Sequence, residues 1–202
     1  MLERIRAIIE AEAAAVRSIP IDASFEKAVA IIHRQVHEKG GKLVTSGMGK
    51  AGQIAHNIAT TFSSTGTPAA YLHPSEAQHG DLGILQPNDV MLVISNSGKT
   101  REIVELIELK NDLYADVPVI VITSQGDSPL AGCADCALLT GNPPEVCALG
   151  LTPTTSTTIM TVIGDALVVM LMEKIGFDAT EYSKRHHGGY LGAKSRSISG
   201  RG

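Results

Sequence analysis

The sequence predicts an α/β protein, a three-layer α-β-α sandwich around a five-stranded parallel sheet of flavodoxin-like type. Five short apolar runs rich in valine and isoleucine follow residue 41, and segments with helical periodicity separate most of them. Continuous apolar strands that alternate with helices are typical of a parallel sheet covered on both faces. Because the chain shows neither an internal repeat nor a linker, residues 1–202 are predicted to form a single domain.

The first forty residues are predicted to form two helices. Apolar side chains recur at helical spacing over residues 5–16 and again over 28–36. Pro20 separates the two stretches, and either Asp22 or Ser24 can cap the second helix. The pair Gly40–Gly41 then ends this helical region.

The sheet and its covering helices are predicted from the rest of the chain. The expected strands are 42–45, 69–73, 90–95, 117–123 and 136–140. The expected helices are 51–63, 101–113 and 155–174, with a short turn near 128–130. Residues 178–202 form a polar tail that contains a second Gly-Gly pair, and we expect this tail to contribute to a functional site.

Composition excludes some classes of function. A net charge of −4, a pI near 6.0 and 3% aromatic residues without tryptophan argue against a nucleic-acid-binding protein. An odd number of cysteines and an N-terminus unlike a secretory signal predict a cytoplasmic protein, and apolar runs such as 117–123 are too short to cross a bilayer. The Cys133–Cys136 pair is interpreted as small packing residues at the start of a strand.

Ligands of open parallel sheets bind beyond the carboxyl ends of the strands, so the loops there are the candidate sites. The first is the loop Ser46–Lys50, whose glycines can expose backbone N–H groups at a helix start to an anion. It is not a Walker A motif. Gly47, Gly49 and Gly52 have dinucleotide-binding spacing, but the next strand lacks the acidic residue that this function needs. A plain tight turn remains the alternative.

The second loop, Ser95–Thr100, has stronger phosphate-binding character. Two serines, an asparagine and a threonine lie between a buried strand and an amphipathic helix. Hydroxyl groups and helix-terminal N–H groups together can hold a phosphate without a metal, whereas simple capping needs one such side chain. A third polar run, 152–158, is predicted mainly to cap and pack against the helix that follows it.

Titratable residues gather near the same sheet edge. They lie in the polar segment 71–81, at Glu102 and Glu145, and at His186 and His187 in the tail. His33 and His37 share a helix face at the spacing of metal ligands, but no third ligand lies nearby in the sequence. We therefore interpret these two histidines as part of a solvated helix face.

These motifs, in this order, resemble the sugar isomerase (SIS) domain, and specifically the arabinose-5-phosphate isomerases of the KdsD/KpsF/GutQ type. The resemblance covers nearly the whole chain. It is carried by SGMGKAG at 46–52, TFSSTGTPA at 61–69, HPSEAQHGDLG at 73–83, ISNSGKTREI at 94–103, LGLTPTTSTT at 149–158, GDAL at 164–167 and HHGGYLG at 186–192.

The resemblance implies interconversion of D-arabinose 5-phosphate and D-ribulose 5-phosphate through a cis-enediol, which supplies Kdo for lipopolysaccharide or capsule. It also implies a homotetramer with sites at subunit interfaces and no cofactor. The catalytic positions it implies are Lys50, Glu102, Glu145, His79 and His186. The substrate and its phosphate are assigned to Ser46, Gly47, Ser95, Asn96, Ser97, Thr100 and His187.

Chemical reasoning then divides the roles. Of the two glutamates, Glu145 is preferred as the base, because Glu102 lies in a first helical turn, where we expect the helix dipole to stabilise its negative charge and make it a weaker base. A histidine, His186 or His79, is expected to act as the acid, and Lys50 to stabilise negative charge. If His79 and His186 converge, we expect them to accept an inhibitory zinc ion.

The chain departs from the family pattern in two places. The family has H-P-G-G where this chain has His186-His187-Gly188-Gly189, which leaves open which histidine acts. Its longer members carry CBS domains, so this chain is expected to be a short form, with any feedback coming from CMP-Kdo in the active site. The alternatives are an isomerase of another sugar phosphate and a non-catalytic sugar-phosphate-binding regulator.

Overall fold

The computed structural model describes residues 1–200, so the last two residues of the predicted domain and tail lie outside the description. All five predicted strands are present and all pair in parallel, in the order β2-β1-β3-β4-β5. Their bounds are Leu43–Gly47 for β1, Ala69–Tyr71 for β2, Val90–Ile94 for β3, Val119–Thr123 for β4 and Cys136–Leu139 for β5. This is the flavodoxin-like strand order, so the predicted fold class is confirmed.

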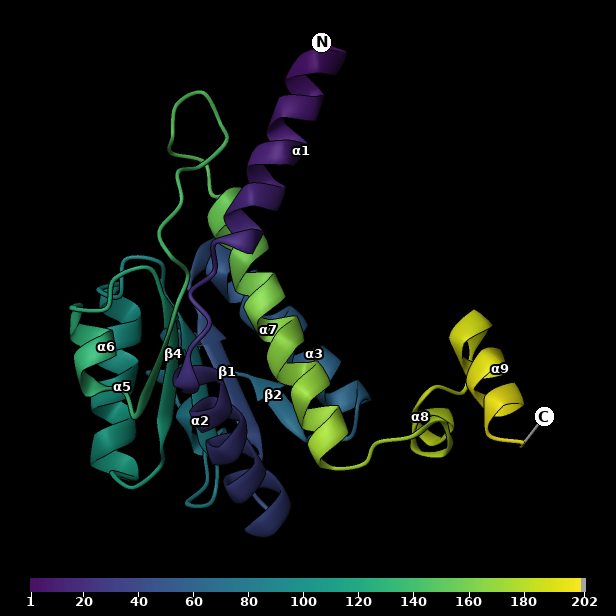
Figure 1. The fold of residues 1–202 in the computed structure, drawn as a ribbon. Coiled ribbons are helices and arrows are strands. Elements are labelled where there is room, and N and C mark those ends of the chain that lie inside the picture. Colours follow the sequence, from purple (N-terminus) through teal and green to yellow (C-terminus); the bar gives the residue numbers. More distant parts are fainter. Residues whose placement is uncertain (201–202) are drawn as a thin grey trace.

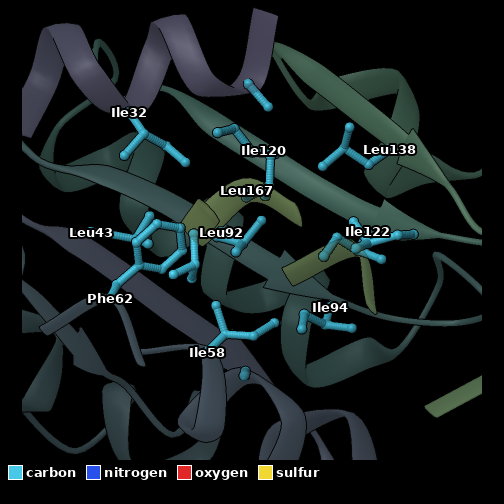
Figure 2. Packing of buried hydrophobic residues seen from close by; sticks show 14 of the residues in the cluster. Ile32, Leu43, Ile58, Phe62, Leu92, Ile94, Ile120, Ile122, Leu138 and Leu167 are labelled. Atoms are coloured by element: carbon cyan, nitrogen blue, oxygen red, sulfur yellow. The ribbon is translucent and has the colours of Figure 1, made fainter. Parts of the chain in front are cut away.

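Helices cover both faces of the sheet (Figure 1). On one face lie α2 (Ala23–Ile32), α3 (Gly49–Ser64) and α7 (Thr155–Lys174), and on the other α4 (Pro74–Ala77), α5 (Arg101–Leu113) and α6 (Pro129–Cys133). Each face has its own hydrophobic core: the first lies under α2, α3 and α7, and the second under α4, α5 and α6. In β3, Leu92 and Ile94 face the first core, whereas Met91 and Val93 face the second. Figure 2 shows the first core, where Phe62 and Ile58 of α3 lie close to Leu92.

The N-terminal helices agree with the prediction. Helix α1 spans Leu2–Arg17, and Asp22 is the cap of α2, since its carboxylate accepts a hydrogen bond from the Ser24 N–H at 2.8 Å. Helix α2 continues as a π-helical segment, η1 (His33–Glu38). There His33 bonds to Glu38, and His37 bonds to the Thr67 hydroxyl at 3.1 Å, so both rings have protein partners.

The glycines of the first strand-end loop are needed for close packing between β1 and α3. A Cβ on Gly47 would lie 2.8 Å from the Ala51 backbone, and one on Gly52 would lie 2.5 Å from the Gly47 carbonyl oxygen. Gly49 adopts a φ of +60°, which favours glycine. The dinucleotide-like spacing is therefore explained by a tight strand-to-helix turn.

Helix α7 corrects one sequence inference. With 20 residues it is long and apolar enough to cross a membrane, whereas the apolar runs of the strands are too short to do so. Half of its most apolar window is buried within the protein, and Ile159, Ile163 and Leu167 pack into the first core. The helix is apolar because it packs against the sheet and α3.

The cysteine pair lies partly as predicted. Cys136 is buried at the first position of β5, and its thiol donates to the Ser24 carbonyl at 3.2 Å. Cys133 lies at the end of α6 and is exposed. Among residues 1–200, no group of three or more histidine, cysteine or acidic side chains is placed to hold a metal ion.

The C-terminal tail and one loop contain structure that the sequence analysis did not predict. The tail forms α8 (Ala179–Arg185) and α9 (Gly189–Ile198), which pack against each other and extend away from the sheet (Figure 1). The polar segment before β3 contains α4 and a 3₁₀ turn, η2 (Asp81–Ile84). The segment therefore contains more structure than a simple turn.

Candidate functional site

A pocket of about 660 Å³ lies beyond the carboxyl ends of β1, β3 and β5, and we call it the strand-end pocket. Lys50 lines it from the start of α3, and Ser95 to Ser97 together with Thr100 line it from the loop after β3. The loop between β5 and α7 supplies Asn142 to Glu145. The pocket therefore brings together both predicted loops and one predicted glutamate.

Three helices begin at this pocket: α3, α5 and α7. The N-terminus of a helix carries partial positive charge and unpaired N–H groups, so an anion is favoured there. Neither Met48 nor Thr100, the capping positions of α3 and α5, makes a side-chain capping bond. The first turns of α3 and α5 therefore keep donors for an anionic ligand.

The loop Ser95–Thr100 is held rigidly beside the end of β4. The Asn96 carbonyl accepts hydrogen bonds from the Ser124 N–H at 3.0 Å and the Ser124 hydroxyl at 2.7 Å. The Ser95 and Thr100 hydroxyls are bonded to each other at 2.7 Å across the loop. Exposed Asn96 and Ser97 stand at the pocket with their side chains accessible. This arrangement suits a preformed phosphate cradle.

Lys50 is the cation of the pocket. It is the second residue of α3 and is exposed. It forms no ion pair with any residue between 1 and 200. An ammonium group without a carboxylate partner can approach negative charge on a bound ligand.

Glu145 reaches the start of α7 and caps it. One carboxylate oxygen accepts from the Thr154 N–H at 2.7 Å, the Thr154 hydroxyl at 3.0 Å and the Ser156 N–H at 3.3 Å. Burial raises the pKa of Glu145, but the hydrogen bonds from Ser156 and Thr154 together outweigh burial and hold it below its usual value. The argument that set Glu102 below Glu145 as a base therefore applies to Glu145 as well.

Six predicted residues do not line this pocket: four that lie outside the tail, and the two tail histidines described below. Ser46 is fully buried, and its hydroxyl donates to the Leu72 carbonyl at 2.7 Å. The Gly47 carbonyl accepts from the Tyr71 hydroxyl at 3.0 Å. Glu102 is half-buried at the second position of α5, and His79 is exposed in the turn before η2. Their assigned roles stay predictions.

The two tail histidines differ in how they are held. The His186 ring stacks on Tyr182 with centroids 3.7 Å apart, and its Nδ1 lies 3.1 Å from the Tyr182 carbonyl oxygen. Because a carbonyl oxygen only accepts, Nδ1 is the donor in this contact, and a neutral ring held in this way has its lone pair on Nε2. His187 is exposed. Neither histidine lines the strand-end pocket of its own chain.

A larger hollow, of about 890 Å³, lies elsewhere, between α2 and α7. Its walls are mostly apolar, with Ile19, Phe25, Val29 and Met170 among them. It lacks the serine hydroxyls and the free helix N-termini of the strand-end pocket. The smaller pocket is therefore the better candidate for a polar, anionic ligand.

The sequence analysis missed part of the pocket wall. Asn142 lines the pocket with a φ of +51°, an uncommon left-handed conformation for a residue other than glycine. The run 152–158 was expected to cap α7, and Thr154 is its N-cap residue, but the Glu145 carboxylate accepts the capping hydrogen bonds. The run of six hydroxyl residues at 152–158 was the available signal.

Comparison with known proteins agrees with this geometry. The model of the SIS domain matches residues 36–170. A structure from Bacteroides fragilis, of a protein assigned as a phosphosugar isomerase involved in capsule formation, superimposes with a TM-score of 0.93 at 64% identity, over 94% of this chain and 99% of that one. This chain belongs to the SIS-domain family.

Two further relatives of this SIS domain are informative. An Escherichia coli CFT073 protein in complex with arabinose 5-phosphate superimposes with a TM-score of 0.85 at 33% identity, over 92% of this chain and 96% of that one. Arabinose 5-phosphate isomerase KdsD of Shigella flexneri is 49% identical over 154 residues, which are 76% of this chain and 46% of that protein. The chain spans about half the length of the curated relatives it matches.

Proposed function

We propose that this SIS domain is an aldose–ketose isomerase that interconverts D-arabinose 5-phosphate and D-ribulose 5-phosphate. The observation that carries the proposal is the strand-end pocket, where a phosphate cradle, a free lysine and a carboxylate face one space. The name of the Shigella relative and the sugar-phosphate complex of the E. coli protein supply the substrate. Use of the product for Kdo, in lipopolysaccharide or capsule, belongs to the same proposal, as does a cytoplasmic location.

The proposed reaction moves one carbon-bound proton. The phosphate binds to the loop Ser95–Thr100 and the first turn of α5, which orients the sugar chain. Glu145 takes the proton from C2 of the open-chain aldose, which leaves a cis-enediolate with its negative charge on O1. A proton then moves from O2 to O1, and Glu145 delivers its own proton to C1 of this intermediate to give the ketose. Lys50 stabilises the negative charge that develops on the oxygen atoms. Glu145 is ionised at neutral pH, as a base must be, because its pKa lies below the usual value, and the same lowering makes it a weaker base.

His186 is proposed to complete the pocket of a neighbouring subunit in a homotetramer. The helices that carry it extend away from their own sheet (Figure 1), and α1 exposes the apolar side chains of Leu2, Ile5 and Ile9. The Nε2 lone pair of a neutral His186 ring can accept the proton of the substrate O2 hydroxyl and then deliver it to O1. His79 and His187 are candidates for the same interface. A zinc ion bound between His79 and His186 would inhibit the proposed isomerase.

Two inactive variants can test this sharing of sites. We expect Lys50→Ala and His186→Ala to be inactive alone, and their co-expressed mixture to regain activity in about a quarter of the sites. Recovery is expected because a site can then take Lys50 from one chain and His186 from the other. A mixture that stays inactive, although native mass spectrometry shows mixed oligomers, would place both residues in one chain.

A panel of sugar phosphates tests the proposed function itself. The protein is incubated with arabinose 5-phosphate, ribose 5-phosphate and hexose 6-phosphates, and ketose formation is measured. We expect turnover with arabinose 5-phosphate alone. Turnover of a hexose phosphate would show that the protein is an isomerase of another sugar phosphate. Tight binding without turnover would indicate a non-catalytic regulator. CMP-Kdo is added as a competitor, because a pocket of about 660 Å³ has room for a larger product to act as feedback ligand.

A further inference from the structure

Glu12 on α1 has a contact that packing alone does not explain. One of its carboxylate oxygens accepts a hydrogen bond from the Thr155 hydroxyl at 3.0 Å, and the other is buried without a partner among residues 1–200. Burying an unpaired carboxylate oxygen lowers the free energy of unfolding. Neighbouring positions on the same helix, Ala11 and Ala15, carry alanine. An apolar residue would serve α1–α7 packing at lower cost, so the glutamate at this position needs another explanation.

Thr155 is the first residue of α7 and is 1% exposed. The residues on either side of it, Thr154 and Ser156, donate the hydrogen bonds that hold Glu145. A short path therefore runs from Glu12 through Thr155 and the first turn of α7 to the Glu145 carboxylate. Displacing that turn would displace all three donors together.

The loop that carries Glu145 has little other support on this side. Between it and α1 lies a hollow of about 500 Å³, lined by Ile8, Ala11 and Pro144 among others. The direct contact across it is a long hydrogen bond, from Arg4 to the Val146 carbonyl at 3.4 Å. The position of Glu145 thus depends mainly on the first turn of α7.

We propose that Glu12 is a positioning residue, which fixes the first turn of α7 through Thr155 and so holds Glu145 in the strand-end pocket. The expected effect on turnover rests on the proposed function. The claim that Glu12 holds Glu145 in place does not. Glu12 does not line the strand-end pocket. The charged groups that line the hollows beside Glu145 are Lys50 from α3 and Arg4 from α1.

The test compares variants on the two sides of the contact. Glu12→Ala and Thr155→Val are each expected to lower kcat about tenfold, with KM unchanged within about twofold. The double variant is expected to be no worse than either single variant. Glu12→Gln keeps an acceptor for Thr155 and is expected to retain most activity. Glu10→Ala, on the exposed side of the same helix, is the matched control.

A second readout separates positioning from simple loss of stability. The pKa of Glu145, followed by carbon NMR without substrate, is expected to rise in Glu12→Ala, because its hydrogen bonds weaken. In Glu12→Gln it is expected to stay at the wild-type value. An unchanged pKa in folded Glu12→Ala would overturn the proposal, whether or not the protein proves to be an isomerase. A fall in Tm with no change in this pKa would do the same.

Discussion

Glu145→Gln is expected to lower kcat by about a hundred- to ten-thousand-fold and to leave KM within a few-fold of the wild-type value. Glutamine keeps an acceptor oxygen for the Thr154 and Ser156 donors, so the loop should stay in place. It cannot take a proton from carbon, so turnover should be lost while binding remains. The measurement is steady-state kinetics with arabinose 5-phosphate, together with equilibrium binding of the substrate.

The control for this variant is Glu108→Gln, which changes an exposed glutamate on α5 and should behave like the wild type. Near-normal turnover in Glu145→Gln would transfer the base role to Glu102 or to a histidine. The pH profile gives a further check. Because the pKa of Glu145 lies below the ordinary 4.5, protonation of Glu145 should lower kcat/KM only when the pH falls below that value. A separate decline near the ordinary pKa of a histidine, about 6.5, would report the histidine that accepts the hydroxyl proton and not Glu145.

Gly98→Ala is expected to raise KM at least about tenfold by displacing the phosphate cradle. Gly98 has a φ of +62°, and a Cβ there would lie 2.4 Å from the Ser128 Cβ and 2.0 Å from its hydroxyl oxygen. The left-handed conformation costs a residue with a Cβ about 1–2 kcal/mol, and the contact with Ser128 adds to that cost. Ser95 and Thr100 lie on either side of this glycine and are bonded to each other, so a shift of Gly98 should displace both hydroxyl groups.

A matched glycine, Gly176, separates backbone strain from the steric contact with Ser128. Gly176 has a φ of +64°, and a Cβ there would meet nothing within 4 Å, so Gly176→Ala introduces the backbone strain alone. We expect it to lower Tm with no change in KM. The double variant Gly98→Ala/Ser128→Gly removes the contact with the Ser128 side chain and leaves the one with the Thr123 hydroxyl at 2.9 Å, so it should recover part of the affinity. Equal KM values for Gly98→Ala and Gly176→Ala would show that the cradle tolerates a side chain.

Much of the site could be predicted because its signals are local. The hydroxyl-rich run after β3 and the helical period of 101–113 lie side by side in the chain, so together they predict a phosphate cradle at a helix start. Lys50 follows in the same way from its place at the start of α3. Ser46 shows the limit of this reasoning. It sits at a strand end like Ser95, but its side chain points to the buried Leu72 carbonyl instead of the pocket.

The relation between Glu145 and α7 could not be predicted from spacing. Thr154 lies nine residues after Glu145, and the loop between them folds back so that one carboxylate meets donors from both Thr154 and Ser156. The acceptor that caps this helix is therefore set by the fold of the loop and not by the residue next to the helix, as it is for Asp22 and α2. The same holds for Glu12, which is 143 residues away from Thr155.

The sequence by itself therefore determined the fold class, the five parallel strands and the strand-end loops that form the candidate site, because strand and helix periodicity and glycine turns act over a few residues. The tertiary structure decided which side chains reach the strand-end pocket, that Glu145 caps α7, and that His186 lies on helices away from its own sheet. Those features depend on how distant segments pack, and the free energy of that packing is not encoded in any one short stretch of the chain.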